Sequence, residues 1–308
     1  MAYYNENIDL VVEPGWLTVT VGNSSDRPPR PGREGGGPWK RRGKMGNLLY
    51  LLVSFLASVA GAICGIGGGV IIKPVLDLCG LASVSTISFL SGCTVLSMSC
   101  YNVGKNIRSG SNLVNFRTGT PLALGAAAGG VLGNQLFKLI KAMFENQNAV
   151  GAVQAGCLAL VTVGTLAYTL RKAHIRTHRV ENRGICLAIG GVLGLMSSFL
   201  GIGGGPINLV VLFFFFSMDT KTAAQNSLYI ILFSQAASLL TSLLTRSVPS
   251  FSSVALALMV AGGIGGGAMG RSLNRKMDNR AVDRLFLCLM AVIILISLYN
   301  TWKYAQMM

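Results

Sequence analysis

Apolar stretches of membrane-spanning length alternate with short polar segments between Asn47 and Lys303. A helix of about 20 residues is needed to cross the hydrocarbon core of a bilayer. The pattern therefore predicts eight long helices, at residues 47–64, 83–103, 120–144, 149–170, 184–200, 222–244, 248–270 and 285–302. Two shorter apolar segments, Val70–Leu81 and Pro206–Met218, follow the first and fifth of them. The expected fold class is an all-α polytopic membrane protein.

The same string, Gly-Ile-Gly-Gly-Gly, interrupts this pattern twice, at Gly65–Gly69 and at Gly201–Gly205. Each copy follows a long apolar run and precedes a short one. Within lipid, irregular backbone is tolerated only where protein or a water-filled cavity satisfies its polar groups. Paired broken helices are the feature that marks the binding site in many transporters. The two breaks therefore predict where a working site lies.

The chain matches itself beyond the glycine string. At an offset of 136 residues, Thr86 and Ser91 recur as Thr222 and Ser227. Two glycine triplets with four-residue spacing correspond at an offset of 137; these are Gly125, Gly129 and Gly133, and Gly262, Gly266 and Gly270. Such spacing gives a ridge of small residues on one helix face, which lets helices pack closely in lipid. The sequence predicts two homologous halves of about four spans each.

The expected organisation has four parts. A basic tail, 1–46, precedes the first transmembrane repeat, 47–170; a basic linker, 171–183, leads to the second repeat, 184–303. The tail is rich in Pro, Gly and Arg and lacks the apolar core of a signal peptide, so we expect it to be disordered and retained. Its basic cluster, Lys40–Lys44, abuts the first span and favours a cytoplasmic tail.

Composition excludes a soluble protein. Hydrophobic residues make up 51% of the chain and charged residues only 12%, and the mean hydropathy is +0.56. The net charge of +15 does not indicate nucleic acid, because the basic residues lie in the tail and in loops between apolar segments. The expected partner is the lipid bilayer.

Loop charge leaves two topologies open. If each broken segment crosses once in net, the protein has eight spans with both termini in the cytoplasm. If each short segment is a separate crossing, the repeats are inverted and the basic loops 105–117, 171–183 and 271–284 share one side. The first is preferred, since Val70–Leu81 gives only about 18 Å of helix.

Catalytic chemistry is scarce. The seven cysteines lie in or beside apolar segments without a CxxC pair, and we interpret them as small reduced hydrophobes. His174 and His178 have the spacing of a metal pair, but no nearby Glu or Cys completes a site. There is no GxSxG motif and no P-loop. We expect no enzyme, no cofactor and no metal.

The duplicated string makes a resemblance visible. GIGGGVIIKP at Gly65–Pro74 resembles the glycine motif of the sulfite exporter TauE/SafE family, also described as probable membrane transporter proteins. The second copy, GIGGGPINLV at Gly201–Val210, has Pro206 directly after the string and lacks the later proline. The resemblance covers about Asn47 to Lys303. It implies a transporter of small sulfur-containing anions such as sulfite or organosulfonates.

The physics of a broken helix suits such a substrate. A helix that begins inside the membrane presents free N–H groups and the positive end of its dipole, which bind anions. We expect two facing cradles for the anion, made of Gly67, Gly68 and Gly69 in the first half and Gly203, Gly204 and Gly205 in the second. The alternative is that these glycines only let two helices cross closely.

Charged and polar side chains near the breaks extend the candidate site. Lys73 is a basic residue inside an apolar segment, and it either attracts the anion or is locally paired or snorkelling. Asp77, one helical turn later, either carries a coupling proton or, more simply, pairs with Lys73. The candidate hydroxyl and amide donors are Ser91, Thr94, Asn226 and Ser227, each with interhelix bonding as the alternative.

The function that we expect is secondary transport or facilitated passage of small sulfur-containing anions across the cell membrane. An anion channel or an intramembrane scaffold without transport is the alternative, and an intramembrane enzyme is the least favoured. The chain is expected to bind a small anionic substrate, to lie in the bilayer, to bind no nucleic acid and to be capable of forming a homo-oligomer.

Overall fold

The computed structural model describes residues 38–110, 114–143, 147–202 and 204–306. The tail is predicted to be disordered, and its residues 1–37 lie outside these ranges. Gly203, a predicted site residue, also lies outside them. Two units separate at Arg41. The first is described only at Pro38–Arg41, and the second, Arg42–Met308, contains the helices discussed below.

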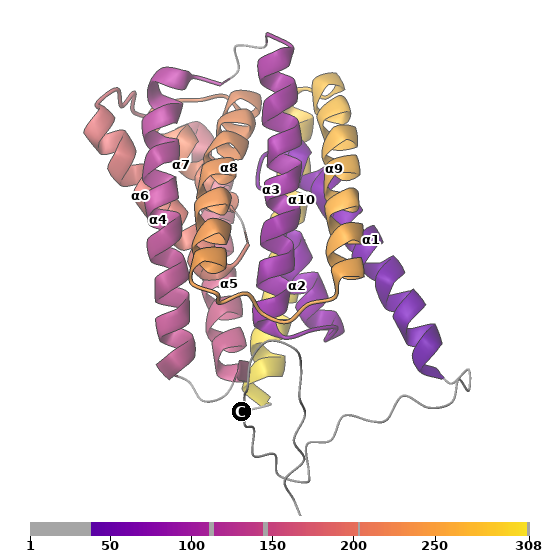
Figure 1. Ribbon diagram of the computed structural model, residues 1–308. Coiled ribbons are helices and arrows are strands. Elements are labelled where there is room, and N and C mark those ends of the chain that lie inside the picture. Colours follow the sequence, from indigo (N-terminus) through magenta and orange to yellow (C-terminus); the bar gives the residue numbers. More distant parts are fainter. Residues whose placement is uncertain (1–37, 111–113, 144–146, 203, 307–308) are drawn as a thin grey trace, which may run out of the picture. The chain divides into compact units, whose positions relative to one another are not determined.

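Every regular element in the described ranges is helical (Figure 1). The helices are α1 (Pro38–Cys64), α2 (Gly69–Cys79), α3 (Val84–Arg108), α4 (Phe116–Met143), α5 (Gln147–Arg171), the 3-10 turn η1 (Lys172–His174), α6 (Arg183–Leu200), α7 (Pro206–Phe216), α8 (Thr220–Leu244), α9 (Ser253–Lys276) and α10 (Asn279–Gln306).

These elements confirm the predicted fold class. Seven described helices are long and apolar enough to cross a membrane, and α4 and the short α2 and α7 complete the pattern. Each glycine string ends one long helix and starts a short one: α1 stops at Cys64 and α2 begins at Gly69, while α6 stops at Leu200 and α7 begins at Pro206. The protein is an all-α polytopic membrane protein.

The helices that the 136-residue offset relates run in opposite directions. Near the end of α3, Asn106 donates to Gln225 near the start of α8. Near the start of α3, Gly92 instead packs against Gln235 in the second half of α8. Helices α5 and α10 are also antiparallel, because Gly151 meets Tyr304 whereas Lys172, just beyond the end of α5, binds Asp283 at 2.6 Å. This is the inverted arrangement.

The eight long helices that the sequence predicts are present, but the preferred topology, in which each broken segment crosses once in net, is wrong. Asn300 Nδ2 donates to Pro74 O and Lys303 Nζ to Leu78 O, so α2 runs parallel to α10. By contrast, α1 and α3 both run parallel to α9, because successive glycines of α9 meet successively later residues of both helices. Thus α1 and α2 form a hairpin that returns to the end of the bundle where it started. A helix as short as α2 does not have to complete a crossing if it turns back.

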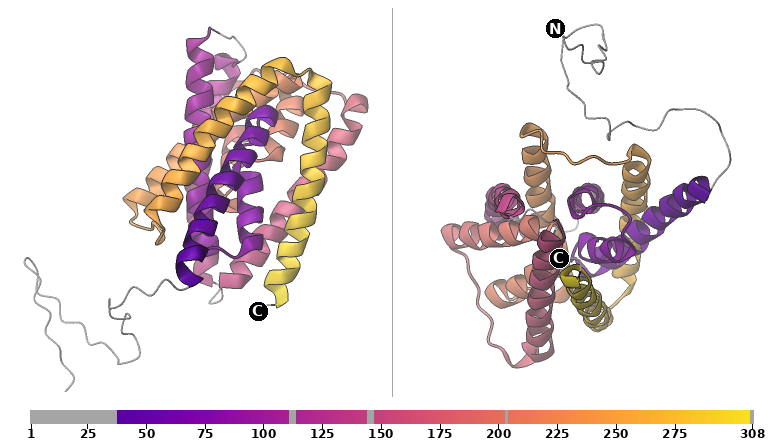
Figure 2. Two further views of the ribbon diagram at one scale, coloured as in Figure 1. Left: turned by 90° about the vertical axis from the view of Figure 1, so that its right-hand side faces the viewer. Right: turned by 90° about the horizontal axis from the view of Figure 1, so that it is seen from below.

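The glycine ridges pack against equivalent helices. Added Cβ atoms at Gly125 and Gly129 would lie 2.0 and 1.9 Å from the carbonyl oxygens of Leu187 and Gly191 in α6. In the other half, Gly266 and Gly270 face the carbonyls of Phe55 and Val59 in α1. Figure 2 shows α9 beside α1. The carbonyls are themselves related by the 136-residue offset, as Phe55 to Gly191. Internal duplication, which stays a prediction, would give this correspondence.

We name the two ends of the bundle by what lies there. The linker end holds residues 172–182 with the ends of α3, α5 and α9, and the C-terminal end is where α10 finishes (Figure 1). Arg271 in α9 donates to the carbonyls of Asn102 and Lys105 in α3, which joins these helices at the linker end. The described parts of the basic loops 105–117, 171–183 and 271–284 all lie at the linker end (Figure 1), as the inverted topology requires.

Candidate functional site

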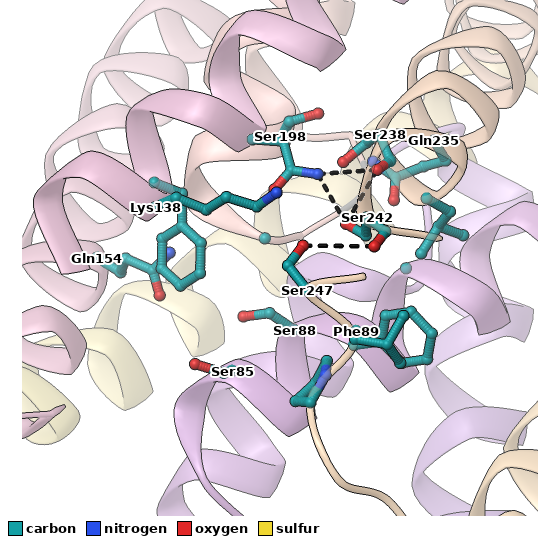
Figure 3. A pocket seen from close by; sticks show the side chains of 17 residues that line it. Ser85, Ser88, Phe89, Lys138, Gln154, Ser198, Gln235, Ser238, Ser242 and Ser247 are labelled. Carbon is teal, nitrogen blue, oxygen red and sulfur yellow. Dashed lines mark hydrogen bonds between the residues drawn. The ribbon is translucent and has the colours of Figure 1, made fainter. Parts of the chain in front are cut away.

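A cavity of about 370 Å³ lies between the two halves and extends to the loop after α8 at the C-terminal end (Figure 3). Its walls come from α3, α4, α5, α6, α8 and the loop after α8. The polar residues that line it are Ser85, Ser88, Asn134, Lys138, Gln154, Ser198, Gln235, Ser238, Ser242 and Ser247. It has the volume of a small-molecule site.

The lining favours a negative solute. Lys138 is its one charged residue, and no carboxylate is among the described residues that form the wall. Six serines and three amides also line it. The amide nitrogens of Asn134 and Gln154 already donate to protein acceptors, so the serine hydroxyls are the principal neutral donors. Neutral donors bind an oxyanion less tightly than cationic groups do, so such a wall also allows the anion to be released. The side chains of Ser88 and Ser198 keep hydroxyl oxygens that have no protein partner among the described residues.

Asn134 orders the side of the cavity formed by α4 and α8. Its Nδ2 donates to Ser238 O at 2.8 Å and to Ser242 Oγ at 2.7 Å (Figure 3). One turn further along α4, Lys138 Nζ donates to Thr245 Oγ1 at 2.6 Å. These bonds place an ammonium group near the mouth of the cavity, where it can attract anions from the water phase.

The second glycine break forms part of the cavity wall. Gly201 ends α6 in the left-handed conformation, with φ 64°, and lines the cavity. A Cβ there would lie 2.6 Å from Ser88 Oγ and 3.1 Å from Lys73 Nζ. Only glycine combines this backbone conformation with so close an approach. The break thus brings bare main chain to the cavity.

Buried groups hold the last carbonyls of α6 in place. Lys73 Nζ donates to Leu200 O at 2.8 Å and to Gln154 Oε1 at 2.5 Å, and Gln154 Nε2 donates to Phe199 O at 2.6 Å. The carbonyls at a helix end lack intrahelical partners, and a cation there is favourable. Because Gln154 also lines the cavity, the ammonium group lies one hydrogen bond behind its wall.

Lys73 and Asp77 do not form the direct pair that the sequence favoured. Asp77 makes no ion pair with Lys73 among the described residues. A small cavity of about 10 Å³ lies between them instead, also lined by Ser297 and Asn300. Asp77 Oδ1, Ser297 Oγ and Asn300 Oδ1 are buried without a protein partner in the described residues. The space suits one water molecule.

The first glycine break lies behind the cavity wall. Gly67 adopts φ 73°, Gly68 caps α2 and Gly69 begins it. A Cβ at Gly69 would lie 1.9 Å from Ile202 O and 2.9 Å from Ser91 Oγ. The two breaks therefore face each other, as the cradle hypothesis requires, but they meet in direct backbone contact. Anion binding by these glycines stays a prediction.

The other predicted residues are also held by protein contacts. Gly204 packs on Ile231, and Gly205 precedes Pro206 at the start of α7. Thr94 Oγ1 donates to Leu90 O, while Ser227 Oγ accepts from Asn208 at 3.5 Å. Asn226 accepts from Asn115 N and donates to Thr222 O. None of the described residues predicted for the site, Lys73 and Asp77 included, lines the large cavity.

Most of the cavity lining was missed from the sequence. The prediction centred on the glycines and on the polar residues that directly follow them. A sequence signal for the lining was available: polar residues four positions apart within apolar helices. These are Asn134 with Lys138 and Ser238 with Ser242. Gln154 gave a similar signal as an amide within an apolar run, and it is buried in the first half of α5, with 3% of its surface exposed.

The equivalent place at the linker end is bridged by side chains. Arg271 occupies the position that the 137-residue offset relates to Asn134. It donates to Asn102 O at 2.9 Å, Lys105 O at 3.2 Å and Ser109 Oγ at 3.1 Å. The bond from Asn106 to Gln225 closes the gap between α3 and α8. The two halves are thus open toward the C-terminal end and joined toward the linker end.

Comparisons with known proteins agree with this architecture. The chain is 23% identical to the probable membrane transporter protein YunE of Bacillus subtilis, over 77% of this chain and 92% of that relative. No solved structure matches. The family model described as sulfite exporter TauE/SafE matches residues 50–297, which include all of α2–α9 and most of α1 and α10. The chain therefore belongs to the sulfite exporter TauE/SafE family of membrane transporters.

Proposed function

We propose that this transporter carries small sulfur-containing oxyanions, such as sulfite or an organosulfonate, through the cavity between its two halves. The single observation that supports the proposal most is the lining of that cavity: hydroxyls, amides and one lysine, with no carboxylate among its described residues. A sulfonate or sulfite group has several acceptor oxygens and no donor when ionised, so it matches a wall of donors.

The direction of opening suggests how the anion moves. We place the cavity's entrance at the C-terminal end, and the contacts of Arg271 close the linker end. In a transporter with inverted repeats, exchanging the conformations of the two halves exchanges the open and closed ends. Transport then requires that Arg271 release α3 at the linker end while the helices around Asn134 close together at the C-terminal end.

Orientation follows from charge. The positive-inside rule places an end rich in Lys and Arg in the cytoplasm. The linker end carries the three basic loops, whereas the C-terminal end carries fewer basic residues; from Arg42 onward in the described ranges these are Arg42, Lys44, Lys138, Lys141, Arg246 and Lys303. We therefore propose a plasma-membrane protein with the linker end in the cytoplasm, which reverses the expectation for the N-terminal tail.

Asp77 is the candidate for ion coupling. It is buried, it lies beside Tyr304, and its Oδ1 faces the small cavity shared with Lys73. A carboxylate inside a membrane protein is costly and usually functional. We propose that Asp77 exchanges a proton during the cycle, because protonation would alter how firmly Lys73 is held at the end of α6.

A flux assay in proteoliposomes tests the proposed function. Uptake of sulfite, thiosulfate, sulfoacetate and acetate is compared, and we expect the sulfur anions to be carried well above acetate. Saturation of the flux with substrate favours a carrier, whereas a linear rise favours a channel. Flux of acetate equal to that of the sulfur anions contradicts the proposed substrate class. Absence of flux for every anion contradicts transport and favours a scaffold.

Coupling is tested separately with Asp77→Asn. An imposed pH gradient should drive uptake by the native protein, and D77N should retain exchange of internal for external substrate while losing this response. If the pH gradient drives uptake equally well in D77N, Asp77 does not carry the coupling proton. The control is Asp219→Asn, an exposed carboxylate before α8 that is remote from Lys73 in the fold.

A further inference from the structure

A second concave feature lies on the outer side of the bundle, away from the transport cavity. It is a groove of about 480 Å³ between the first turns of α4 and α6 at the linker end. Arg117 and Arg183 line it together with the apolar residues Phe116, Leu124 and Leu187. From this combination we infer that the groove binds one anionic phospholipid, with the phosphate between the two arginines.

The polar and apolar parts of the groove are ordered along the helix axis. Leu124 follows Arg117 by seven residues, which is about 10 Å along an α-helix. Leu124 and Leu187 are 54% and 51% exposed in the protein alone, so they face lipid. Two arginines at one end of the groove, with exposed leucines further along the helices, match a phospholipid, which has a charged head group and apolar chains. A free phosphate ion would use only the arginines.

The arginines are available for such a ligand. Arg117 lies 3.9 Å from Glu181, but both side chains are more than 70% exposed. Exposed ion pairs at this distance contribute little, so a lipid phosphate competes well with Glu181. The second amide of each helix, Arg117 N in α4 and Gly184 N in α6, already donates to the side chain of Asn115 or Asn182. The attraction that we infer comes from the charge of the two guanidinium groups.

The molecule contains its own comparison. The sequence offsets relate Arg117 to Val254 on α9 and Arg183 to Asn47 on α1, at the C-terminal end. Leu187 corresponds to Leu51, so an apolar surface is kept there while both charges are absent. The arginine pair therefore has no counterpart at these two equivalent positions, and it lies at the linker end, the end that we propose is in the cytoplasm. Anionic lipids are concentrated in that leaflet, and basic pockets between membrane helices bind their head groups.

The inference is tested by lipid retention on the full-length protein. The purified protein is mixed with phosphatidylglycerol and phosphatidylcholine, and bound lipid is counted by native mass spectrometry. We expect preferential retention of phosphatidylglycerol, and on the order of tenfold weaker retention by the double variant R117Q/R183Q. The matched control is R176Q/R179Q, which removes the same charge from the exposed linker outside the groove.

Three results would overturn the inference. They are equal loss in the control, no preference between the two lipids in the native protein, and displacement of phosphatidylglycerol by millimolar inorganic phosphate. The charge-retaining variant R117K/R183K keeps the test valid if the glutamine variant is unstable, because it should restore most of the retention. Failure of R117K/R183K to do so would also count against the phosphate site.

Discussion

At the scale of single residues, Gly201 carries the connection between the break and the cavity. It combines a left-handed conformation with contacts to Ser88 and Lys73 that leave no room for a side chain. The same string in the first half is packed behind the wall, where Gly65 meets Ala224. Identical sequences thus occupy different environments, because the side chains around them differ between the halves.

The first prediction is that Gly201→Ala abolishes anion flux and lowers stability by roughly 1–3 kcal/mol. A Cβ there would displace Ser88 and strain a backbone with positive φ. Flux in proteoliposomes and the unfolding temperature in detergent measure the two effects. Gly164→Ala in α5 is the control, since nothing lies within 4 Å of its added Cβ, and it should keep flux. Full flux in G201A would remove Gly201 from the path.

The sequence located the breaks correctly but not the residues that line the cavity. A glycine string predicts irregular backbone, because this property depends on residues that are adjacent in the sequence. Which groups surround it depends on contacts between residues far apart in the chain, such as Lys73 with Leu200, 127 residues away. No local pattern reports that an ammonium group caps a helix of the other half.

At the scale of helices, each glycine ridge packs a long helix of one half against a long helix of the other half. Along α4 and α9 they let carbonyl oxygens of α6 and α1 approach to distances that exclude a Cβ. The sequence predicted these ridges and the helix positions to within a few residues, because hydropathy and small-residue spacing are local properties. It did not identify the helix that each ridge contacts.

The second prediction concerns these ridges. Gly129→Ala and Gly266→Ala should each lower the unfolding temperature clearly, since the added Cβ would lie 1.9 Å from Gly191 O and 2.3 Å from Phe55 O. Thermal unfolding in detergent is the measurement. Gly104→Ala in α3 has no neighbour within 4 Å and should be neutral. A loss in Gly104→Ala equal to that of both ridge variants would refute a packing role for the ridges.

At the scale of the whole molecule, the direction of the two halves decides the mechanism. Charge pattern contained the answer, because three basic loops share one side only if the repeats are inverted. The shortness of Val70–Leu81 argued against it, since a crossing of that length is too short. A short helix that turns back removes this objection, and α1 and α2 form such a hairpin.

The third prediction is that Arg271→Ala opens the linker end. Loss of its bonds to α3 should expose Asn102, which is 1% exposed behind the guanidinium. A cysteine placed at residue 102 should react faster with a water-soluble thiol reagent when R271A is also present. Arg280→Ala, an exposed cation at the same end, serves as the control for charge. Unchanged reactivity would mean that Arg271 does not close this end.

The most direct test of the account asks whether a sulfur anion occupies the cavity between the halves. Ser242→Cys places a thiol on the cavity wall, and Ser253→Cys places one at the same end outside it, each in a background without the native cysteines. The account predicts that sulfoacetate slows modification of the cysteine at 242 in a saturable manner, while acetate does not, and that neither affects 253. Equal modification of the cysteine at 242 with and without sulfoacetate would contradict it.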